Sequence, residues 1–442
     1  MCTIIAAPVS PQILTFFHSN NLLYRTLLVT IWELGEIFAP LVWGPLSEIY
    51  GRRWILHGAN LLFIGCLAGT AWSTNIQLLI AFRFLSGLAT ACIPLGPGIV
   101  KDLFAKDQRG RAMSLMSLTS VVGPVVGPIV GSYLGEQAGW RWVFWLPTLL
   151  SAFLGVLLLL VYRETYKVTI LCHRASPSAA NHYPSKPNIA GSLLRPITLL
   201  YRSPALLVPT LHLSLIYGLT YLVMTTIAPV FQDVYRFSEG ASGLAFLGLC
   251  LGFTLGAVIC SLLLDRFISP APTSTATSTA TTTPTNPTTT PPPPSNSGSA
   301  EPEKRLPPLL PACLLTAAGL VLFGWTVQYR IHFLVPILGT AMVGLGLAAT
   351  SITVQTYVVD SFGVCAVSAI SAVMVVRNVA AVVVPLAGPG LFGRLGYGWG
   401  GTVLGGVVLV ILPVPVVVMR FGGRWRGRSK GCGGGRGDED RG

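Results

Sequence analysis

Charged residues are scarce in this sequence, which has 442 residues of which only 10% are charged and 52% are hydrophobic. Soluble globular proteins carry about 25% charged residues, so a water-soluble fold is excluded. Apolar stretches of roughly 20 residues cross a bilayer as helices, because the backbone must satisfy its own hydrogen bonds in lipid. The composition therefore predicts an all-α membrane protein.

Motifs for metal and nucleotide chemistry are also missing. The nine cysteines show no CxxC pairing, so the sequence does not indicate zinc or disulfide chemistry. No GxxxxGK(S/T) pattern occurs, which argues against a phosphate loop for ATP. We expect no metal site, no cofactor and no enzymatic activity.

Apolar runs between charged or Pro/Gly-rich breaks predict eleven complete membrane spans. They lie near residues 24–44, 54–73, 77–99, 112–134, 142–162, 205–230, 242–264, 309–328, 331–354, 365–388 and 400–420. A shorter apolar piece, residues 3–17, precedes them. At about 1.5 Å rise per residue it is too short to cross a hydrocarbon core of roughly 30 Å. We expect it to be the outer half of a truncated first span.

Basic residues orient these spans, since Lys and Arg are retained on the cytoplasmic side. If the turn at residues 44–56 is cytoplasmic, the loops on its side hold 22 of the 29 Lys and Arg residues, and the opposite loops hold five. The other two, Arg83 and Arg377, lie within spans. The net charge of +13 thus reflects membrane topology, and we do not interpret it as nucleic-acid binding.

Polar segments divide the chain into two halves. Residues 1–163 hold six spans, counting the incomplete one, and residues 205–420 hold six more. Between them we expect a cytoplasmic linker at 164–204, with a disordered Thr/Pro-rich cytoplasmic loop at 269–308 and a basic cytoplasmic tail at 421–442. Parallel six-span repeats are a transporter architecture, with substrate bound near mid-membrane between the halves.

The segment GPLSEIYGRRWIL, residues 44–56, places charges and glycines directly after the second span. Glycines permit a tight turn, and a glutamate there can pair with a basic neighbour in one conformation and release it in another. We therefore predict a cytoplasmic gate formed by Gly44, Glu48, Gly51, Arg52, Arg53, Asp102, Arg111 and Asp360. The alternative is that the arginines only anchor the topology.

Glu33 and Glu36 are the acidic residues within the spans, and their spacing of three puts them on one side of a helix. Arg83 lies in the fourth span, where a buried arginine is costly unless it is paired or faces water. Burial disfavours the charged form of a carboxyl, while a nearby arginine favours it. We predict that Glu33 or Glu36 is the proton site and that Arg83 is its electrostatic partner. Alternatively, these acids bind a cationic substrate without titrating.

Further residues are candidates for substrate contact by their position in the spans alone. They are Trp32, Tyr217, Tyr221, Tyr357, Arg377 and Asn378. Each of the aromatic residues could equally be ordinary packing or part of an interfacial belt.

Glycines recur at intervals of four in two spans. The fifth span contains GPVVGPIVGS, with Gly123, Gly127, Pro128 and Gly131, and the eighth contains Gly248, Gly252 and Gly256. Small residues four apart make a smooth helix face that another helix can approach closely. We expect the two faces to form a seam between the halves.

Three of these motifs resemble signatures of the major facilitator superfamily. Residues 44–53 resemble its cytoplasmic loop signature, with Glu48 replacing the usual Asp. Leu79, Arg83, Gly87 and Ala91 resemble its intramembrane arginine motif, and residues 123–132 resemble the antiporter signature of the drug:proton antiporter branch, with Ser132 replacing the final glycine. The resemblance covers nearly the whole chain, including residues 30–53, which look like twelve-span fungal exporters of drugs, toxins or polyamines.

This resemblance implies two six-helix bundles around a central cavity. It also implies a monomeric plasma-membrane protein, rather than a vacuolar one, that exports small organic molecules in exchange for protons by alternating access. Uptake or symport of a small organic solute is an alternative, and so is a transport-inactive truncated paralogue. The sequence does not identify the substrate.

Overall fold

The computed structural model describes residues 4–19, 21–90, 99, 123, 126–162, 197–268, 302–362 and 366–428. Most of the predicted linker at 164–204 and most of the predicted loop at 269–308 lie outside these ranges, as does the end of the predicted tail beyond residue 428. All regular secondary structure within the described ranges is helical, which confirms the predicted all-α class.

The first half contains α1 (Ser10–Phe16), α2 (Leu22–Tyr50), α3 (Arg52–Ala71), α4 (Ile76–Leu88), the helical residues 126–138 and α7 (Trp140–Val161). Asn21 caps α2, because its Oδ1 accepts a hydrogen bond from the Leu23 N–H at 2.9 Å. Gly51 separates α2 from α3 with a φ of 87°, a conformation that favours glycine. The tight turn predicted at this glycine is therefore present.

The second half contains α10 (Pro204–Asp233), α11 (Glu239–Leu244), α12 (Phe246–Ile268), η2 (Pro302–Arg305), α13 (Leu309–Gln328), α14 (Leu334–Phe362), α15 (Ala366–Leu386), α16 (Gly388–Val410) and α17 (Pro413–Arg428). Ser238 caps α11, since its Oγ accepts from the Ala241 N–H at 3.2 Å. Gly396, with a φ of 73°, kinks α16.

The predicted bounds need correction at the C-terminal end. The apolar run near 400–420 is part of a longer helical stretch, which begins with α16 at Gly388 and continues through α17 to Arg428. The first residues of the predicted basic tail are thus helical. The eighth span is also divided into α11 and α12 at Ala245. Hydropathy locates apolar runs, but glycine and proline backbone preferences decide where a helix breaks.

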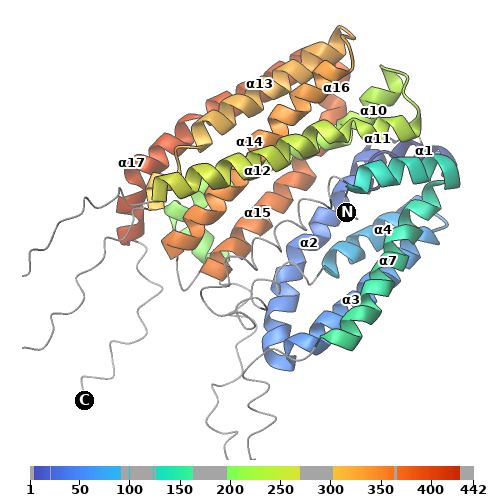
Figure 1. The fold of residues 1–442 in the computed structure, drawn as a ribbon, viewed down its shortest axis with the longest axis horizontal. Helices are drawn as coiled ribbons and strands as arrows, with labels where there is room; N and C mark the ends of the chain where they lie inside the picture. Colours follow the sequence, from blue (N-terminus) through green and yellow to red (C-terminus); the bar gives the residue numbers. More distant parts are fainter. Residues whose placement is uncertain are drawn as a thin grey trace, which may run out of the picture.

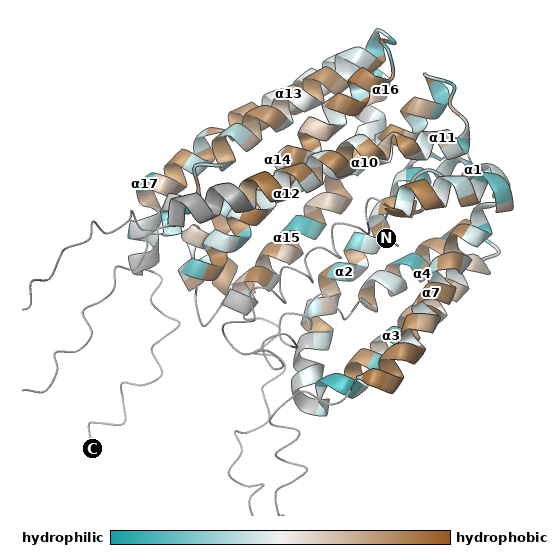
Figure 2. Ribbon diagram, in the orientation of Figure 1, coloured by the Kyte–Doolittle hydropathy of each residue, from teal (hydrophilic) through white to brown (hydrophobic). Residues whose placement is uncertain are grey.

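Nine helices among the described residues are long and apolar enough to cross a membrane. Large apolar side chains such as Phe153 and Leu160 of α7 are 68% and 79% exposed, whereas Glu33 and Arg83 are 2% and 1% exposed. Apolar residues cover the outer faces of the bundle in Figure 2. This reversal of the pattern in soluble proteins is that of a bundle whose surroundings are lipid.

The helices form two groups, as Figure 1 shows. The group from the first half holds α2, α3, α4 and α7, and the group from the second half holds α10 and α12 to α17. At the centre, α2 packs along α15 and also contacts α10. The boundary between the halves therefore runs beside the helix that carries Glu33 and Glu36.

Candidate functional site

The two glutamates of α2 are both buried, with Glu33 2% and Glu36 9% exposed. On one side, α2 lies very close to α4: a Cβ added at Gly87 would collide with the Trp32 carbonyl, and one at Gly35 with the Phe84 carbonyl. Glycine at these two positions removes the side chains that would otherwise separate the helices. The close crossing of α2 and α4 thus sets the position of the acidic segment.

Glu33 is hydrogen bonded across the boundary between the halves. The Tyr221 hydroxyl of α10 donates to Glu33 Oε1 at 2.6 Å. The Tyr217 hydroxyl donates in turn to the Tyr221 hydroxyl at 3.4 Å, and the two rings lie 4.9 Å apart. This chain of hydroxyls connects the carboxyl of one half to a helix of the other.

Arg377 of α15 lies at the same place. Its guanidinium carbon is 4.4 Å from the centre of the Tyr217 ring, and its Nε donates to Asn378 Oδ1 at 3.1 Å. It interacts electrostatically with both Glu33 and Glu36. We call Glu33, Glu36, Tyr217, Tyr221 and Arg377 the central cluster.

Two aromatic rings are among the neighbours of Arg83, and its pairing with the glutamates stays a prediction. Its guanidinium carbon lies 5.5 Å from the Trp32 ring centre and 5.7 Å from that of Phe144. Arg377 interacts electrostatically with both glutamates, although the sequence suggested it only as a substrate contact. Both α4, which carries Arg83, and α15, which carries Arg377, pack along α2, and spacing within one helix cannot reveal its neighbours.

The other predicted substrate residues divide into two groups. Trp32 is buried beside Arg83, while Asn378 is 1% exposed next to Arg377. Tyr357 is fully buried in an apolar cluster with Leu206 and Leu213. The structure thus brings Tyr217, Tyr221, Arg377 and Asn378 to the glutamates, but it places Tyr357 in apolar packing.

Much of the predicted cytoplasmic gate lies outside the described residues. The Glu48 side chain, Asp102 and Arg111 belong to this undescribed part. Arg52 and Arg53 begin α3 and are half-buried. Asp360, near the end of α14, forms an ion pair with Arg305 of η2 at 2.7 Å. The cytoplasmic gate therefore stays a prediction. The ion pair of Asp360 joins two elements of the second half.

The glycines of α12 do not face the fifth span. Cβ atoms added at Gly248, Gly252 and Gly256 would meet the carbonyls of Ile337, Ala341 and Leu345. These carbonyls belong to α14, so the glycine face packs inside the second half. A Cβ at Gly131 of the fifth span would meet Ile5. The expected seam is therefore corrected for Gly131, Gly248, Gly252 and Gly256, whose neighbours belong to their own half. Pro128 of the same motif does lie at the other half, since a Cβ added at Gly243 would be 2.9 Å from its carbonyl.

The fifth and eighth spans nevertheless meet at their expected outer ends through other residues. The buried Ser132 hydroxyl donates to the Gly240 carbonyl at 3.0 Å, and Glu136 Oε2 accepts from the Gly240 N–H at 3.0 Å. A Cβ at Gly243 would collide with Ser132. We call Ser132, Glu136, Gly240 and Gly243 the outer contact. Ser132 stands where the antiporter signature has glycine, and its hydroxyl makes a bond that glycine cannot make.

Removing the Glu136 carboxylate should open the outer contact. A hydrogen bond to a charged acceptor contributes about 1.5–3 kcal/mol, so Glu136→Ala should shift the balance towards outward-open states roughly 10- to 100-fold. Spin labels at the exposed positions Thr74 and Arg330, on the outer ends of the two halves, would report this as a larger fraction of long distances. Gln137→Ala, at the exposed neighbouring residue, is the control. An unchanged distance distribution in Glu136→Ala would show that the contact does not hold the halves together.

No group of three or more His, Cys, Asp or Glu side chains suited to a metal occurs within the described ranges. The central cluster combines acidic, phenolic and basic side chains. Its two carboxyls can bind and release protons, and its two phenols and one guanidinium can donate hydrogen bonds to a polar ligand.

Comparison with known proteins places this geometry in context. The family model described as Major Facilitator Superfamily matches residues 1–385. The chain is 39% identical over 430 residues to the MFS-type transporter hepF of Aspergillus oryzae, covering 95% of this chain and 84% of that protein. It is 36% identical over 433 residues to the efflux pump radE of Floropilus chiversii, covering 95% and 77%.

Solved structures share the fold at low sequence identity. The xylose transporter XylE from E. coli, in a partially occluded inward-open conformation, has a TM-score of 0.65 at 16% identity, covering 95% of this chain and 93% of that chain. A bacterial homologue of the human lysosomal transporter Spinster, in an inward-facing and unoccupied conformation, has a TM-score of 0.63 at 14% identity, covering 97% and 94%.

Proposed function

Because the chain belongs to the major facilitator superfamily of membrane transporters, we propose that it exports small organic molecules in exchange for protons. The observation that carries this proposal is the central cluster. Glu33 of one half is hydrogen bonded to Tyr221 of the other at 2.6 Å, and Arg377 interacts electrostatically with the same carboxyl. Transporters built from two such repeats bind substrate and coupling ions near mid-membrane between the repeats.

The charges of the central cluster suit proton exchange. Two carboxyls face one guanidinium, so one proton is enough to neutralise the cluster. With both carboxyls ionised, the excess negative charge favours a cationic or hydrogen-bond-donating substrate. A proton arriving at the same carboxyl removes that attraction, and the substrate is released. Competition of this kind makes substrate and proton occupy the site in turn.

The position of the cluster between the halves links this competition to movement. The hydrogen bond from Tyr221 to Glu33 joins the halves, so rocking of one half against the other must alter it. A bond between Gln232 and the Pro8 carbonyl, at 3.2 Å, also joins the halves near the outer contact. These bonds support a state that is closed at the outer end. Opening the outer end and protonating the carboxyl would then be coupled events.

Proton movement supplies enough energy for secretion. One proton crossing about 100 mV releases roughly 2.3 kcal/mol, which sustains a substrate gradient on the order of 50-fold. Because one relative is named an efflux pump, we take export as the direction of transport. The proposed substrate class comprises drugs, toxins, secondary metabolites or polyamines, and the proposed site of action is the plasma membrane.

Transport assays with defined gradients test this function. Metabolites retained by a deletion strain but released by the wild type would identify the substrate. Inside-out vesicles with an acidic lumen should then accumulate it, because protons leaving the lumen drive the substrate in. A protonophore should stop accumulation. Accumulation that needs an alkaline lumen would identify a symporter. Substrate movement that does not depend on the proton gradient would exclude proton coupling.

Removing the guanidinium of Arg377 should impair transport strongly. Arg377→Gln removes a positive charge that interacts electrostatically with both buried glutamates, and a buried carboxylate that loses a counter-charge is costly. We expect gradient-driven uptake into inside-out vesicles to fall at least tenfold. Arg377→Lys, which keeps the charge, should retain more activity than Arg377→Gln. Equal activity of Arg377→Gln and wild type would exclude the guanidinium from the coupling site.

A further inference from the structure

A surface groove is lined by residues of α17, of the turn that precedes it and of the beginning of α13. Figure 1 shows α17 at one end of the molecule. The volume of the groove is about 400 Å³, within the range of roughly 300–1,000 Å³ that is typical of ligand pockets. The apolar residues that line it are Leu310, Leu412, Pro413, Val416, Val417 and Phe421. Arg420 is the remaining lining residue, so the groove combines an apolar wall with one positive charge.

A second positive charge stands beside the same end of the groove. The Arg424 guanidinium carbon lies 5.9 Å from the Phe421 ring centre. Val417, Arg420, Phe421 and Arg424 are spaced at intervals of three and four residues along α17, so they share one face of the helix. Both arginines and Phe421 are exposed, whereas Val418 on another face is 1% exposed. The face therefore combines Val417 and Phe421 with two arginines, and the arginines lie towards its C-terminal part.

The acidic side chains described nearby do not neutralise this face. Asp360 is paired with Arg305 at 2.7 Å. Glu303 is buried and lies against Gly422, on the inward side of α17. Among the described residues, this arrangement leaves the exposed Arg420 and Arg424 open to an anion from outside the protein.

The surroundings of the groove indicate the class of ligand. The apolar stretch Gly388–Trp425 is long and hydrophobic enough to span a membrane, and the groove lies at the end where α17 becomes basic. This is the end that the distribution of Lys and Arg predicts to be cytoplasmic. The cytoplasmic leaflet carries the anionic lipids, and basic residues next to a span attract them. A phospholipid matches both the apolar wall and the basic residues of the groove, since its acyl chain is apolar and its headgroup is charged.

We propose that this groove is a binding site for one anionic phospholipid of the cytoplasmic leaflet. An acyl chain lies along the apolar wall between α13 and α17, and the headgroup phosphate contacts Arg420 and Arg424. An arginine near an anionic surface strengthens binding by roughly fivefold, so two should give about 25-fold. The site is separate from the central cluster and does not depend on the identity of the transported substrate.

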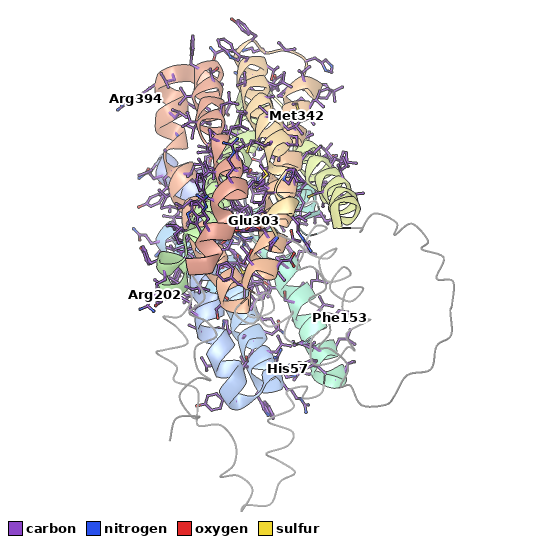
Figure 3. The ribbon with its side chains drawn as sticks, turned by 90° about the vertical axis from the view of Figure 1, so that its left-hand side faces the viewer. His57, Phe153, Arg202, Glu303, Met342 and Arg394 are labelled. Carbon is purple, nitrogen blue, oxygen red and sulfur yellow. The ribbon has the colours of Figure 1, made fainter. Side chains whose placement is uncertain are left out.

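Native mass spectrometry of the purified full-length protein tests this proposal by counting lipid adducts. The protein is titrated with phosphatidylserine, with phosphatidylcholine as the zwitterionic probe and glycerol phosphate as the soluble headgroup probe. The informative variant is Arg420→Gln/Arg424→Gln, and Arg420→Lys/Arg424→Lys keeps the charges. Val416→Trp fills the groove without altering a charge. Arg394→Gln removes an exposed arginine at the opposite end of the molecule from Arg202 and His57, as Figure 3 shows, and is the matched control.

We expect the wild type and Arg394→Gln to bind one phosphatidylserine more tightly than phosphatidylcholine. The double Gln variant should bind phosphatidylserine about 25-fold more weakly, while the double Lys variant retains the preference. Val416→Trp should weaken binding of both lipids. Equal binding of the two lipids by the wild type would overturn the proposal, as would unchanged phosphatidylserine binding in the double Gln variant. Glycerol phosphate competing at the same concentration as the lipid would show an anion site without a chain groove, and this also overturns it.

Discussion

Replacing Glu33 with glutamine is expected to uncouple substrate movement from the proton gradient. The amide keeps the size of the side chain and an oxygen that can accept the Tyr221 hydrogen bond, which is 2.6 Å long in the wild type. It cannot gain or lose a proton at physiological pH. A gradient of about 100 mV that sustains roughly 50-fold accumulation in the wild type should therefore sustain almost none in Glu33→Gln. Substrate flux down its own gradient should persist.

The measurement is substrate-linked proton movement in inside-out vesicles, read with a lumenal pH dye. Glu36→Gln distinguishes the two carboxyls, because the one that carries the proton should show the larger loss. Asp233→Asn removes an exposed carboxyl at the end of α10, outside the central cluster, and should transport like the wild type. If Glu33→Gln and Glu36→Gln both move protons normally with substrate, neither glutamate is the coupling site.

Features confined to one helix could be predicted from the sequence. The spacing of Glu33 and Glu36 placed both on one side of α2, and the glycine at position 51 marked a turn that does occur with a positive φ. The identity of the arginine beside the glutamates could not be predicted in this way. Arg83 and Arg377 look alike as isolated basic residues in apolar spans, and their helices α4 and α15 both pack along α2, so the role of each depends on side-chain positions that the sequence does not give.

The glycine-rich spans also show that sequence spacing does not identify the neighbour of a helix. Spacing of four predicted smooth faces, and Gly248, Gly252 and Gly256 do lie where no side chain fits. Spacing does not name the neighbour, which is α14 and not the fifth span. The contact between the fifth and eighth spans uses a serine, a glutamate and backbone groups instead. Polar residues that bond to a distant backbone leave no periodic pattern in the sequence.

Adding a single methyl group at Gly87, in the fourth span, is expected to have a large effect on stability and transport. Gly87→Ala should destabilise the protein, because the added Cβ would collide with the Trp32 carbonyl and approach the Glu36 nitrogen to 3.2 Å. Backbone atoms of α2 cannot rotate away as a side chain can, so α2 and α4 must separate. Overpacking of this kind costs about 1–3 kcal/mol, and a clash with main chain belongs at the upper end.

Separating α2 from α4 should also displace the central cluster. The new methyl group meets the Trp32 carbonyl, which precedes Glu33, and the backbone nitrogen of Glu36. We expect a lower midpoint of thermal unfolding together with a loss of gradient-driven transport at least tenfold. Gly58→Ala is the matched control, because a Cβ at this exposed position of α3 meets nothing within 4 Å. There alanine should be neutral or stabilising, since glycine inside a helix is less favourable by about 1 kcal/mol. If Gly87→Ala unfolds and transports like Gly58→Ala, the close crossing of α2 and α4 does not set the position of the glutamates.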